Sequence, residues 1–381
     1  MKTFIFYLFI DFWAVTLLFC ADQMVSDRKR ELIQSSNKSV WLDMNFRITG
    51  RHVCFFASFM VLFFVSAMRD HVGMDYRPYA QTYININKGY IDIWNAWLSP
   101  GYVLINKMLG LIDPNNYFLL FTLMAFMTMW YLMKAIYKMS CDWFMSLYLF
   151  ISFCYYYQSF NQFRQILAVT ITTYSCYFLM RGRLKTFLLY VIFAALFHKS
   201  ALIMAGMCFV YKREINLKNL CLYALLCAVI NIGFNTLITV LISFTNYGGY
   251  IGSIYDTYMD GSTILNTLVR IIILAGCLMF SKKTIERVPE MVTFYNSALV
   301  CTVLQTMAMW SHIFGRITTY FYAPYIILIP EVLKTVESYF DKSSARLIRF
   351  FVIVLLLIYH GVYFFNTPKN GVLTYRMLFV N

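Results

Sequence analysis

The sequence predicts an all-α polytopic integral membrane protein, and three observations lead to this fold class. Hydrophobic residues make up 60% of the 381 positions, and only 13% are charged. Soluble globular domains carry about a quarter of charged residues. The mean hydropathy is +0.62, and the apolar residues gather in segments of roughly 17–25 residues, the length of a transmembrane helix. We therefore expect residues 1–381 to form a single transmembrane domain in a lipid bilayer.

About ten transmembrane helices are predicted from these segments, since each is long enough to cross the hydrocarbon core. They cover residues 2–20, 52–68, 117–137, 142–160, 163–181, 218–243, 263–281, 291–311, 316–336 and 347–365. The first segment lacks a basic start beyond Lys2 and a small-x-small cleavage site. We therefore expect an uncleaved helix there and not a signal peptide. Asp11, inside that helix, has no interpretation from the sequence.

The distribution of basic residues predicts which connections face the cytoplasm. The chain holds 32 Lys and Arg against 18 Asp and Glu, a net charge of +14. The basic residues gather in five places, at 21–51, 134–138, 181–185, 282–287 and 342–349. These segments are expected to be cytoplasmic, and the charge excess thus indicates orientation. We expect no nucleic-acid partner, because no basic run is interleaved with exposed aromatic residues.

The apolar stretch 186–211 breaks the simple alternation of sides, because basic residues flank both of its ends. His198 and Lys199 interrupt it, and each half has only about a dozen residues, too short to span alone. We expect a re-entrant or broken helical hairpin with His198 at its turn. Broken backbone at that depth is tolerated where it is buried in protein or lines an aqueous cavity. A single crossing that places Lys212 outside is the alternative.

The connection 69–116 is expected to be an extracytoplasmic loop with short helices within it. It is too long to be a plain connection, because structureless loops beyond about 15 residues are uncommon and usually functional. The run Ser99-Pro100-Gly101 predicts a turn that leads into a helix over 102–112. Tyr, Ile, Asn and Trp alternate over 79–97, which favours a short amphipathic helix or strand at the membrane interface.

Polar side chains gather at the predicted outer ends of the helices, and ionisable groups at membrane depth are candidates for function. Arginine binds phosphate in a bidentate manner and stays charged, so several arginines at one face suit a pyrophosphate-linked lipid. Tyrosine and asparagine stack on sugars and hydrogen-bond to them, and a carboxylate or histidine accepts a hydroxyl proton. The catalytic candidates are Arg69, Asp75, Arg164, His198 and Arg316, and the substrate-binding candidates are Tyr76, Tyr79, Asn161, Gln165, Lys199, His312 and Tyr320.

Several of these candidates also have a structural interpretation. Arg69 lies just beyond a predicted span, from which its side chain would snorkel to the interface. Asp75 would pair with Arg69 or Arg77 and hold the loop. His198 would be a core histidine with satisfied hydrogen bonds. Arg164 is harder to interpret in this way, because it opens a helix, where the helix dipole disfavours a cation.

Known catalytic and metal-binding motifs are absent from the sequence. It holds no P-loop, GxSxG, HExxH or DxD motif, and no Cys/His spacing suits a metal. The ten cysteines lie in or beside apolar segments, where they behave as small hydrophobic residues. We therefore expect no metal and no cofactor. A donor bound as a nucleotide sugar through a metal is disfavoured, and a lipid-phosphate donor at the outer face is favoured.

Three runs of residues, in the same order, resemble the motifs of the EpsG family of Wzy-like bacterial polysaccharide polymerases. They are 68–79 (MRDHVGMDYRPY), 161–168 (NQFRQILA) and 194–202 (AALFHKSAL). Gly315-Arg316 ahead of Tyr320 is similar to the family's late arginine, so the likeness runs from about residue 50 to the end. Ser99 departs from the family, which usually has glutamate before this Pro-Gly. Because the turn is kept, we expect the position to have a structural or substrate-tuning role.

The resemblance implies an enzyme at the outer face of the bacterial cytoplasmic (inner) membrane. It would be a glycosyltransferase that joins undecaprenyl-pyrophosphate-linked oligosaccharide repeat units into O-antigen, capsule or exopolysaccharide. Arg69, Arg164 and Arg316 would neutralise the pyrophosphate leaving group, and Asp75 or His198 would accept the proton of the attacking hydroxyl. A chain-length regulator and a flippase of the same pathway are the protein partners that it implies.

Two other classes of protein stay open. An integral-membrane acyltransferase that modifies the same glycan would also use a membrane histidine, although the sequence identifies no acidic or arginine partner beside His198. A flippase for the lipid-linked oligosaccharide is the other class, and such transporters typically show internal repeats with charges along a central pathway. In this sequence the charges gather at one predicted face and no repeat is visible.

Overall fold

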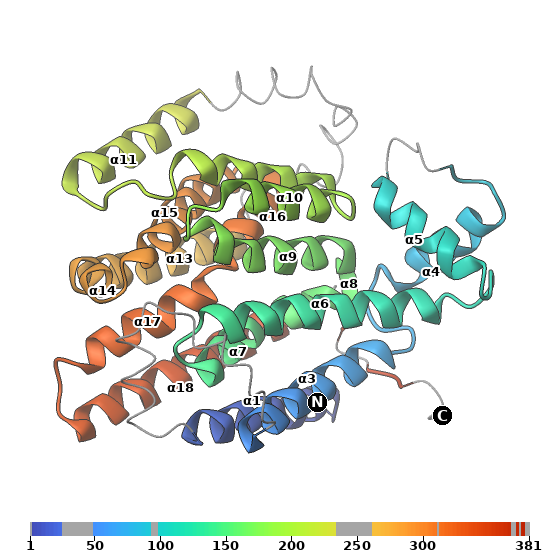
Figure 1. Cartoon of the computed structure of the whole chain (residues 1–381), viewed down its shortest axis with the longest axis horizontal. Coiled ribbons are helices and arrows are strands. Elements are labelled where there is room, and N and C mark those ends of the chain that lie inside the picture. Colours follow the sequence, from blue (N-terminus) through green and yellow to red (C-terminus); the bar gives the residue numbers. More distant parts are fainter. Residues whose placement is uncertain are drawn as a thin grey trace. The chain divides into compact units, whose positions relative to one another are not determined.

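The computed structural model describes residues 2–24, 49–92, 98–233, 261–310, 312–366, 371–372 and 375–377. All regular elements in these ranges are helices, with one isolated antiparallel bridge between Arg69 and Met377 (Figure 1). The helices form two compact units. The first unit comprises Met1–Leu167 and Phe351–Asn381, and the second comprises Ala168–Phe350.

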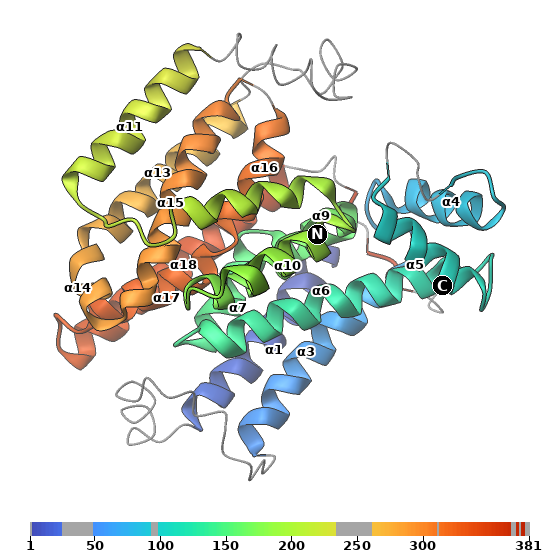
Figure 2. The same cartoon turned by 45° about the horizontal axis from the view of Figure 1, so that its top comes forward.

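The first unit is built on three long helices that pack side by side, with α1 along α3 and α3 along α6 (Figures 1 and 2). Its helices are α1 (Lys2–Gln23), α3 (Gly50–Ala67), α4 (Tyr76–Asn87), α5 (Pro100–Gly110), α6 (Phe118–Met139), α7 (Trp143–Ser152), α8 (Tyr155–Asn161), the start of α9 (Phe163–Leu179) and the end of α18 (Lys342–Asn366). α4 and α5 pack on each other, and α5 also contacts α6.

The second unit is centred on α15, which packs against α11, α13, α16 and α17. After the remainder of α9, its helices are α10 (Leu184–Ala195), the 3₁₀ helix η2 (Lys199–Phe209), α11 (Leu217–Ile232), α13 (Gly261–Met279), α14 (Ser281–Arg287), the 3₁₀ turn η4 (Pro289–Met291), α15 (Val292–Met307), α16 (His312–Tyr322), α17 (Tyr325–Glu337) and the start of α18.

Four of the described helices are long and apolar enough to cross a membrane, which agrees with an α-helical membrane protein. They are Thr3–Gln23, Gly50–Ala67, Phe118–Met139 and Lys342–Val362. The helices Ile264–Met279 and Ser281–Arg287, which meet at a 60° bend, make a fifth if they form one span. The count of about ten expected from the sequence is therefore not supported.

The count differs because several predicted spans are interrupted or shorter than expected. The segment 142–160 is divided between α7 and α8 at Cys154, whose φ of 61° is left-handed and incompatible with a continuous helix. The segment 316–336 is divided between α16 and α17 at Pro324, which lacks the N–H that a helix interior requires. The predicted span 218–243 is described only to Gly233.

The helices expected within the loop 69–116 are present. α5 begins directly after Ser99, and Pro100 stands in its first turn, where a missing N–H costs nothing. The alternating segment that follows the second span is a helix, α4, and not a strand. Residues 93–97 of this segment lie outside the described residues.

Residues 186–211 form a broken hairpin. α10 ends at Ala195, η2 begins at Lys199, and the two helices pack against each other. The end of η2 returns to the beginning of α10, since a Cβ built on Gly182 lies 3.7 Å from Nζ of Lys212. This is the geometry expected from the sequence, with His198 at the turn.

Asp11 is buried and joins three helices of the first unit. The hydroxyl of Tyr157 (α8) donates to its two carboxylate oxygens, at 2.7 and 2.8 Å. Nε2 of His360 (α18) lies 3.9 Å from the same carboxylate. A carboxylate inside an apolar helix is tolerated when it is hydrogen-bonded and paired in this way.

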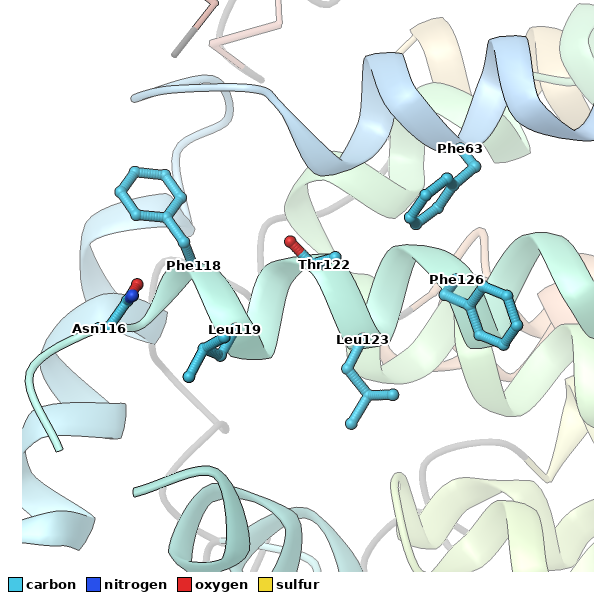
Figure 3. A pocket seen from close by; sticks show the side chains of 7 residues that line it. All are labelled: Phe63, Asn116, Phe118, Leu119, Thr122, Leu123 and Phe126. Carbon is cyan, nitrogen blue, oxygen red and sulfur yellow. The ribbon is translucent and has the colours of Figure 1, made fainter. Parts of the chain in front are cut away.

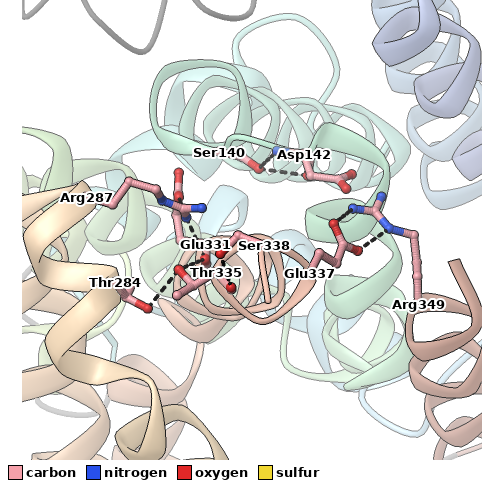
Figure 4. A network of polar contacts seen from close by, with 9 residues as sticks. All are labelled: Ser140, Asp142, Thr284, Arg287, Glu331, Thr335, Glu337, Ser338 and Arg349. Atoms are coloured by element: carbon pink, nitrogen blue, oxygen red, sulfur yellow. Dashed lines mark hydrogen bonds and ion pairs between the residues drawn. The ribbon is translucent and has the colours of Figure 1, made fainter. Parts of the chain in front are cut away.

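Two ion pairs hold α17 within the second unit (Figure 4). Arg287 of α14 donates to the Glu331 carboxylate at 2.5 Å. Arg349 of α18 donates to both carboxylate oxygens of Glu337, at 2.8 and 3.0 Å. Both arginines thus have a carboxylate partner within the protein.

Candidate functional site

Arg69 is buried where the chain leaves α3, with only 1% of the residue exposed. Its guanidinium carbon lies 5.1 Å from the ring centres of both Phe121 and Phe160. Nη1 donates to the carbonyl and hydroxyl oxygens of Ser66. Burial lowers the pKa of Arg69 to about 10, so it keeps its charge at neutral pH. In this structure Arg69 packs α6 and α8 at the end of α3 and does not reach the surface.

The segment that follows Arg69 is tied to the C-terminal end of the chain. The N–H of Asp70 donates to the carbonyl of Arg376 at 2.9 Å. The N–H of Gly73 donates to the carbonyl of Gly371 at 3.1 Å. These two hydrogen bonds hold the loop 70–75 from one side.

Asn161, at the end of α8, holds the same loop from the other side. Its Oδ1 accepts the N–H of Met74 at 2.7 Å. Gly73 has φ +97°, and a Cβ built there would lie 2.7 Å from both Oδ1 of Asn161 and the carbonyl of Phe160. Only glycine fits such a position without strain. Asn161, a substrate-binding candidate, therefore has a structural contact in this arrangement.

Tyr76 and Asp75 stand at the start of α4. The ring of Tyr76 is buried and stacks on Phe121 at 4.6 Å, and its hydroxyl donates to Asp70 at 3.2 Å. Burial raises the pKa of Tyr76. Asp75 occupies the N-cap position, where its carboxylate is half-exposed and makes no capping hydrogen bond. Of the two candidates, Asp75 is the one that solvent reaches.

Arg164 lies in the first turn of α9 against two tyrosine rings. Its guanidinium carbon is 4.9 Å from the ring centre of Tyr102 and 5.6 Å from that of Tyr79. The ring of Tyr79 also contacts Phe163, with 3.8 Å between the ring centres. Cation–π attraction of this kind stabilises a cation that the helix dipole disfavours. Gln165, the next residue, is buried.

Tyr102 is a member of this group that sequence reasoning missed. It is fully buried in α5, and burial raises its pKa. Among the described residues, its hydroxyl and Nε of Arg164 are buried polar atoms without a hydrogen-bond partner. The available signal was its place directly after the Ser99-Pro100-Gly101 turn.

A second group of candidates lies at the turn of the hairpin in the second unit. Nδ1 of His198 lies 2.6 Å from the hydroxyl of Ser200. The Ser200 hydroxyl lies 3.0 Å from that of Tyr320, which is itself 3.4 Å from Nδ1 of His198. Tyr320 is fully buried in α16. The two hydroxyl groups thus hold the imidazole in one orientation, and Ser200 is a further residue that the sequence did not single out.

Cationic candidates lie beside His198, Ser200 and Tyr320, which together form the histidine group. Arg316 is exposed and stands one turn before Tyr320 on α16. Residues four apart share a face of a helix, so Arg316 lies on the face that contacts η2. Lys199 is exposed next to His198. His312 begins α16, and its side chain lies outside what the structure describes.

An open groove of about 340 Å³ lies on the first unit, and none of the candidate residues lines it (Figure 3). It is lined by Phe63 of α3 and by Phe118, Leu119, Thr122, Leu123 and Phe126 of α6, with Asn116 at one end. None of these side chains ionises, so the groove offers no group for proton transfer.

No three His, Cys, Asp or Glu side chains within the described ranges come together in a way that would hold a metal ion.

The model of one protein family matches most of the chain. This is the EpsG family, and the match covers residues 52–377, which include all the candidate residues. No curated protein and no solved structure matches the chain.

Proposed function

The chain belongs to the EpsG family, whose model covers residues 52–377, and from this premise we propose that it is a polysaccharide polymerase. It joins undecaprenyl-pyrophosphate-linked oligosaccharide repeat units at the outer face of the bacterial cytoplasmic membrane. A growing glycan leaves its pyrophosphate carrier and is transferred to a hydroxyl of the next lipid-linked unit.

This transfer makes two chemical demands on the protein. Negative charge that develops on the departing pyrophosphate must be stabilised, which fixed cations do most effectively. The attacking hydroxyl must lose a proton, which requires a base within hydrogen-bond reach and with a pKa near the working pH. Histidine meets the second demand, because its ordinary pKa is about 6.5.

The observation that carries the proposal is the histidine group of the second unit. His198 is oriented through Nδ1 by the hydroxyl of Ser200 at 2.6 Å, and that hydroxyl is held by Tyr320 at 3.0 Å. Arg316 lies on the same face of α16 as Tyr320. We assign His198 the role of general base, and Arg316 and Lys199 that of binding the pyrophosphate.

The first unit offers a separate set of candidates. Tyr79 and Arg164 are half-exposed and suit a sugar ring and a phosphate, while the fully buried Tyr102 supports the guanidinium with its ring face. Asp75, half-exposed at the start of α4, is the alternative base. We assign Arg69 a positioning role and no contact with substrate, because it is buried beneath this loop.

Deletion of the gene, followed by gel analysis of lipid-linked and surface glycans, tests the proposal. We expect single repeat units to accumulate while long chains disappear, with function restored by the wild-type gene but not by His198→Ala or Arg316→Ala. Arg346→Ala is the matched control, since Arg346 is an exposed arginine of α18 that donates to the carbonyl of Lys342 on its own helix. Long chains that persist but lack an acyl group would identify an acyltransferase instead. Repeat units retained at the cytoplasmic face would identify a flippase.

A further inference from the structure

Arg270 is an arginine in the middle of the apolar helix α13. The sequence places it in the predicted span 263–281 and gives no sign of its function. A charged side chain at such a position is costly unless protein groups bind it, and for that reason it usually serves a purpose.

The guanidinium of Arg270 joins α13 to two other helices. Nη1 donates to Oε1 of Gln305 in α15 and, at 2.8 Å, to the hydroxyl of Thr318 in α16. The guanidinium carbon also lies 4.3 Å from the ring centre of Tyr322 in α16. One turn earlier on α13, the hydroxyl of Thr267 accepts from Nε2 of Gln305 at 3.1 Å. Gln305, Thr318, Tyr322 and Thr267 are all buried.

The face of α16 that Arg270 contacts is opposite to the face that carries the histidine group. Thr318 and Tyr322 are four residues apart and share one face. Arg316 and Tyr320 are also four apart and share another. Because an α-helix turns about 100° per residue, positions two residues apart point about 200° away from each other. Arg270 therefore holds the back of α16 while Tyr320 contacts Ser200 and His198 from the front.

We propose that Arg270 is a positioning residue for the glycosyl transfer. By binding Thr318 and Tyr322, it fixes the rotation of α16 about its axis and its position along that axis. Tyr320 then contacts the Ser200 hydroxyl, and Arg316 faces the hairpin turn. Arg270 does not touch the reacting atoms. This inference rests on the proposed polymerase function and adds a residue to it.

The test uses full-length protein in lipid nanodiscs and the single-unit lipid-linked glycan extracted from cells that lack the gene. Initial rates of chain formation give kcat and KM. We expect Arg270→Gln to lower kcat about 100-fold, because misplacement by about 1 Å costs that much, with KM within about twofold of wild type. Arg270→Lys keeps a cation that reaches the same oxygens less well, and we expect it to recover part of the loss.

Thr318→Val carries the test if Arg270→Gln does not fold, since valine has nearly the shape of threonine but cannot accept the hydrogen bond. We expect its kcat to fall as well. Because both changes break one contact, the double variant Arg270→Gln/Thr318→Val should lose less than the product of the two single losses.

Arg287→Gln is the matched control. Arg287 is also an arginine of the second unit, with 28% of its side chain exposed, and it bonds to Glu331 on α17. The Arg287→Gln change should reduce the amount or thermal stability of the protein but leave the kcat of the folded fraction unchanged.

Three results would overturn the inference. They are a wild-type kcat in Arg270→Gln or Thr318→Val, losses that multiply independently in the double variant, and a rise in KM with kcat preserved, which would mean that Arg270 binds substrate. If the wild-type protein itself forms no chains from the glycan, the polymerase function fails, and the inference fails with it.

Discussion

Replacing Gly73 by alanine is expected to open the loop that follows α3. Gly73 has φ +97°, and the added Cβ would lie 2.7 Å from Oδ1 of Asn161 and 2.7 Å from the carbonyl of Phe160. One of these neighbours is backbone, so the loop itself must move. The movement breaks the 2.7 Å bond from the N–H of Met74 to Asn161.

The free-energy cost of Gly73→Ala is the sum of two contributions. Placing a side chain at a positive φ costs roughly 1–2 kcal/mol. Loss of the Met74–Asn161 bond costs about 1 kcal/mol. Together they destabilise the closed loop by about 2–3 kcal/mol, and since every 1.4 kcal/mol is about tenfold, the opened population rises roughly 30- to 150-fold.

Gly89→Ala supplies the matched control. Gly89 also has a positive φ, +79°, but a Cβ there would have no neighbour within 4 Å. We expect only the backbone strain, about 1 kcal/mol or a fivefold effect, confined to the end of α4.

Hydrogen–deuterium exchange of peptides over residues 70–80 measures the opening, because amide exchange reports the population of locally opened states. The Met74 amide should exchange about 30-fold faster or more in Gly73→Ala and at the wild-type rate in Gly89→Ala. Equal exchange of this amide in both variants would refute the close approach to Asn161 as the reason for glycine.

Three further outcomes are expected. Tyr320→Phe removes one hydroxyl from the histidine group, and since one hydrogen bond contributes about 1 kcal/mol, the rate of chain formation should fall about fivefold with no loss of folded protein; an unchanged rate would contradict the role of Tyr320 in orienting the imidazole. Arg287→Met should cost about 3 kcal/mol, because it leaves the buried Glu331 carboxylate unpaired, and thermal unfolding should show most of this loss recovered in Arg287→Met/Glu331→Met. Burial raises the pKa of Tyr375 from 10.0 to about 12. Because the folded protein favours the neutral phenol, this side chain contributes to the free energy of unfolding in full below pH 10. The contribution is lost as the pH rises to 12. Absorbance titration of wild type against Tyr375→Phe should show the difference of one tyrosine ionising near pH 12, and ionisation near pH 10 would show that the side chain is exposed.

Local features of the sequence were sufficient for the membrane class and for several short elements. Long apolar runs predict membrane helices because burial in hydrocarbon depends on composition alone. The helix after Ser99-Pro100 and the break at His198 were predicted because proline and an interrupting polar pair determine the backbone conformation of the residues next to them. The family also followed from short runs of residues, and the match over residues 52–377 confirms it.

The number of spans could not be predicted in the same way. Cys154 adopts φ 61° and separates α7 from α8, yet nothing in the sequence around it distinguishes it from the other cysteines. Left-handed backbone at a residue other than glycine persists only when surrounding packing holds it. Packing between distant segments is invisible in a local pattern.

Arg69 and Asn161 show the same limit for the candidate site. The sequence made both residues candidates for contact with substrate, which stays a prediction, and it did not reveal their contacts within the fold. In the structure the aromatic rings of α6 and α8 bury Arg69, and the loop backbone occupies Oδ1 of Asn161. Which partner a polar group finds depends on what the fold brings near it, and the choice has large consequences because buried polar groups must be satisfied.

The sequence by itself thus determined the membrane-helical class, the hairpin around His198 and the residue types available for chemistry, since these depend on composition and on near neighbours. Only the tertiary structure decided that Tyr320, 120 residues away, contacts Ser200 beside His198, and that Arg270 contacts Thr318, 48 residues away. Such pairings are set by the packing of whole helices, because a side chain reaches only what the helix opposite places within a few ångströms.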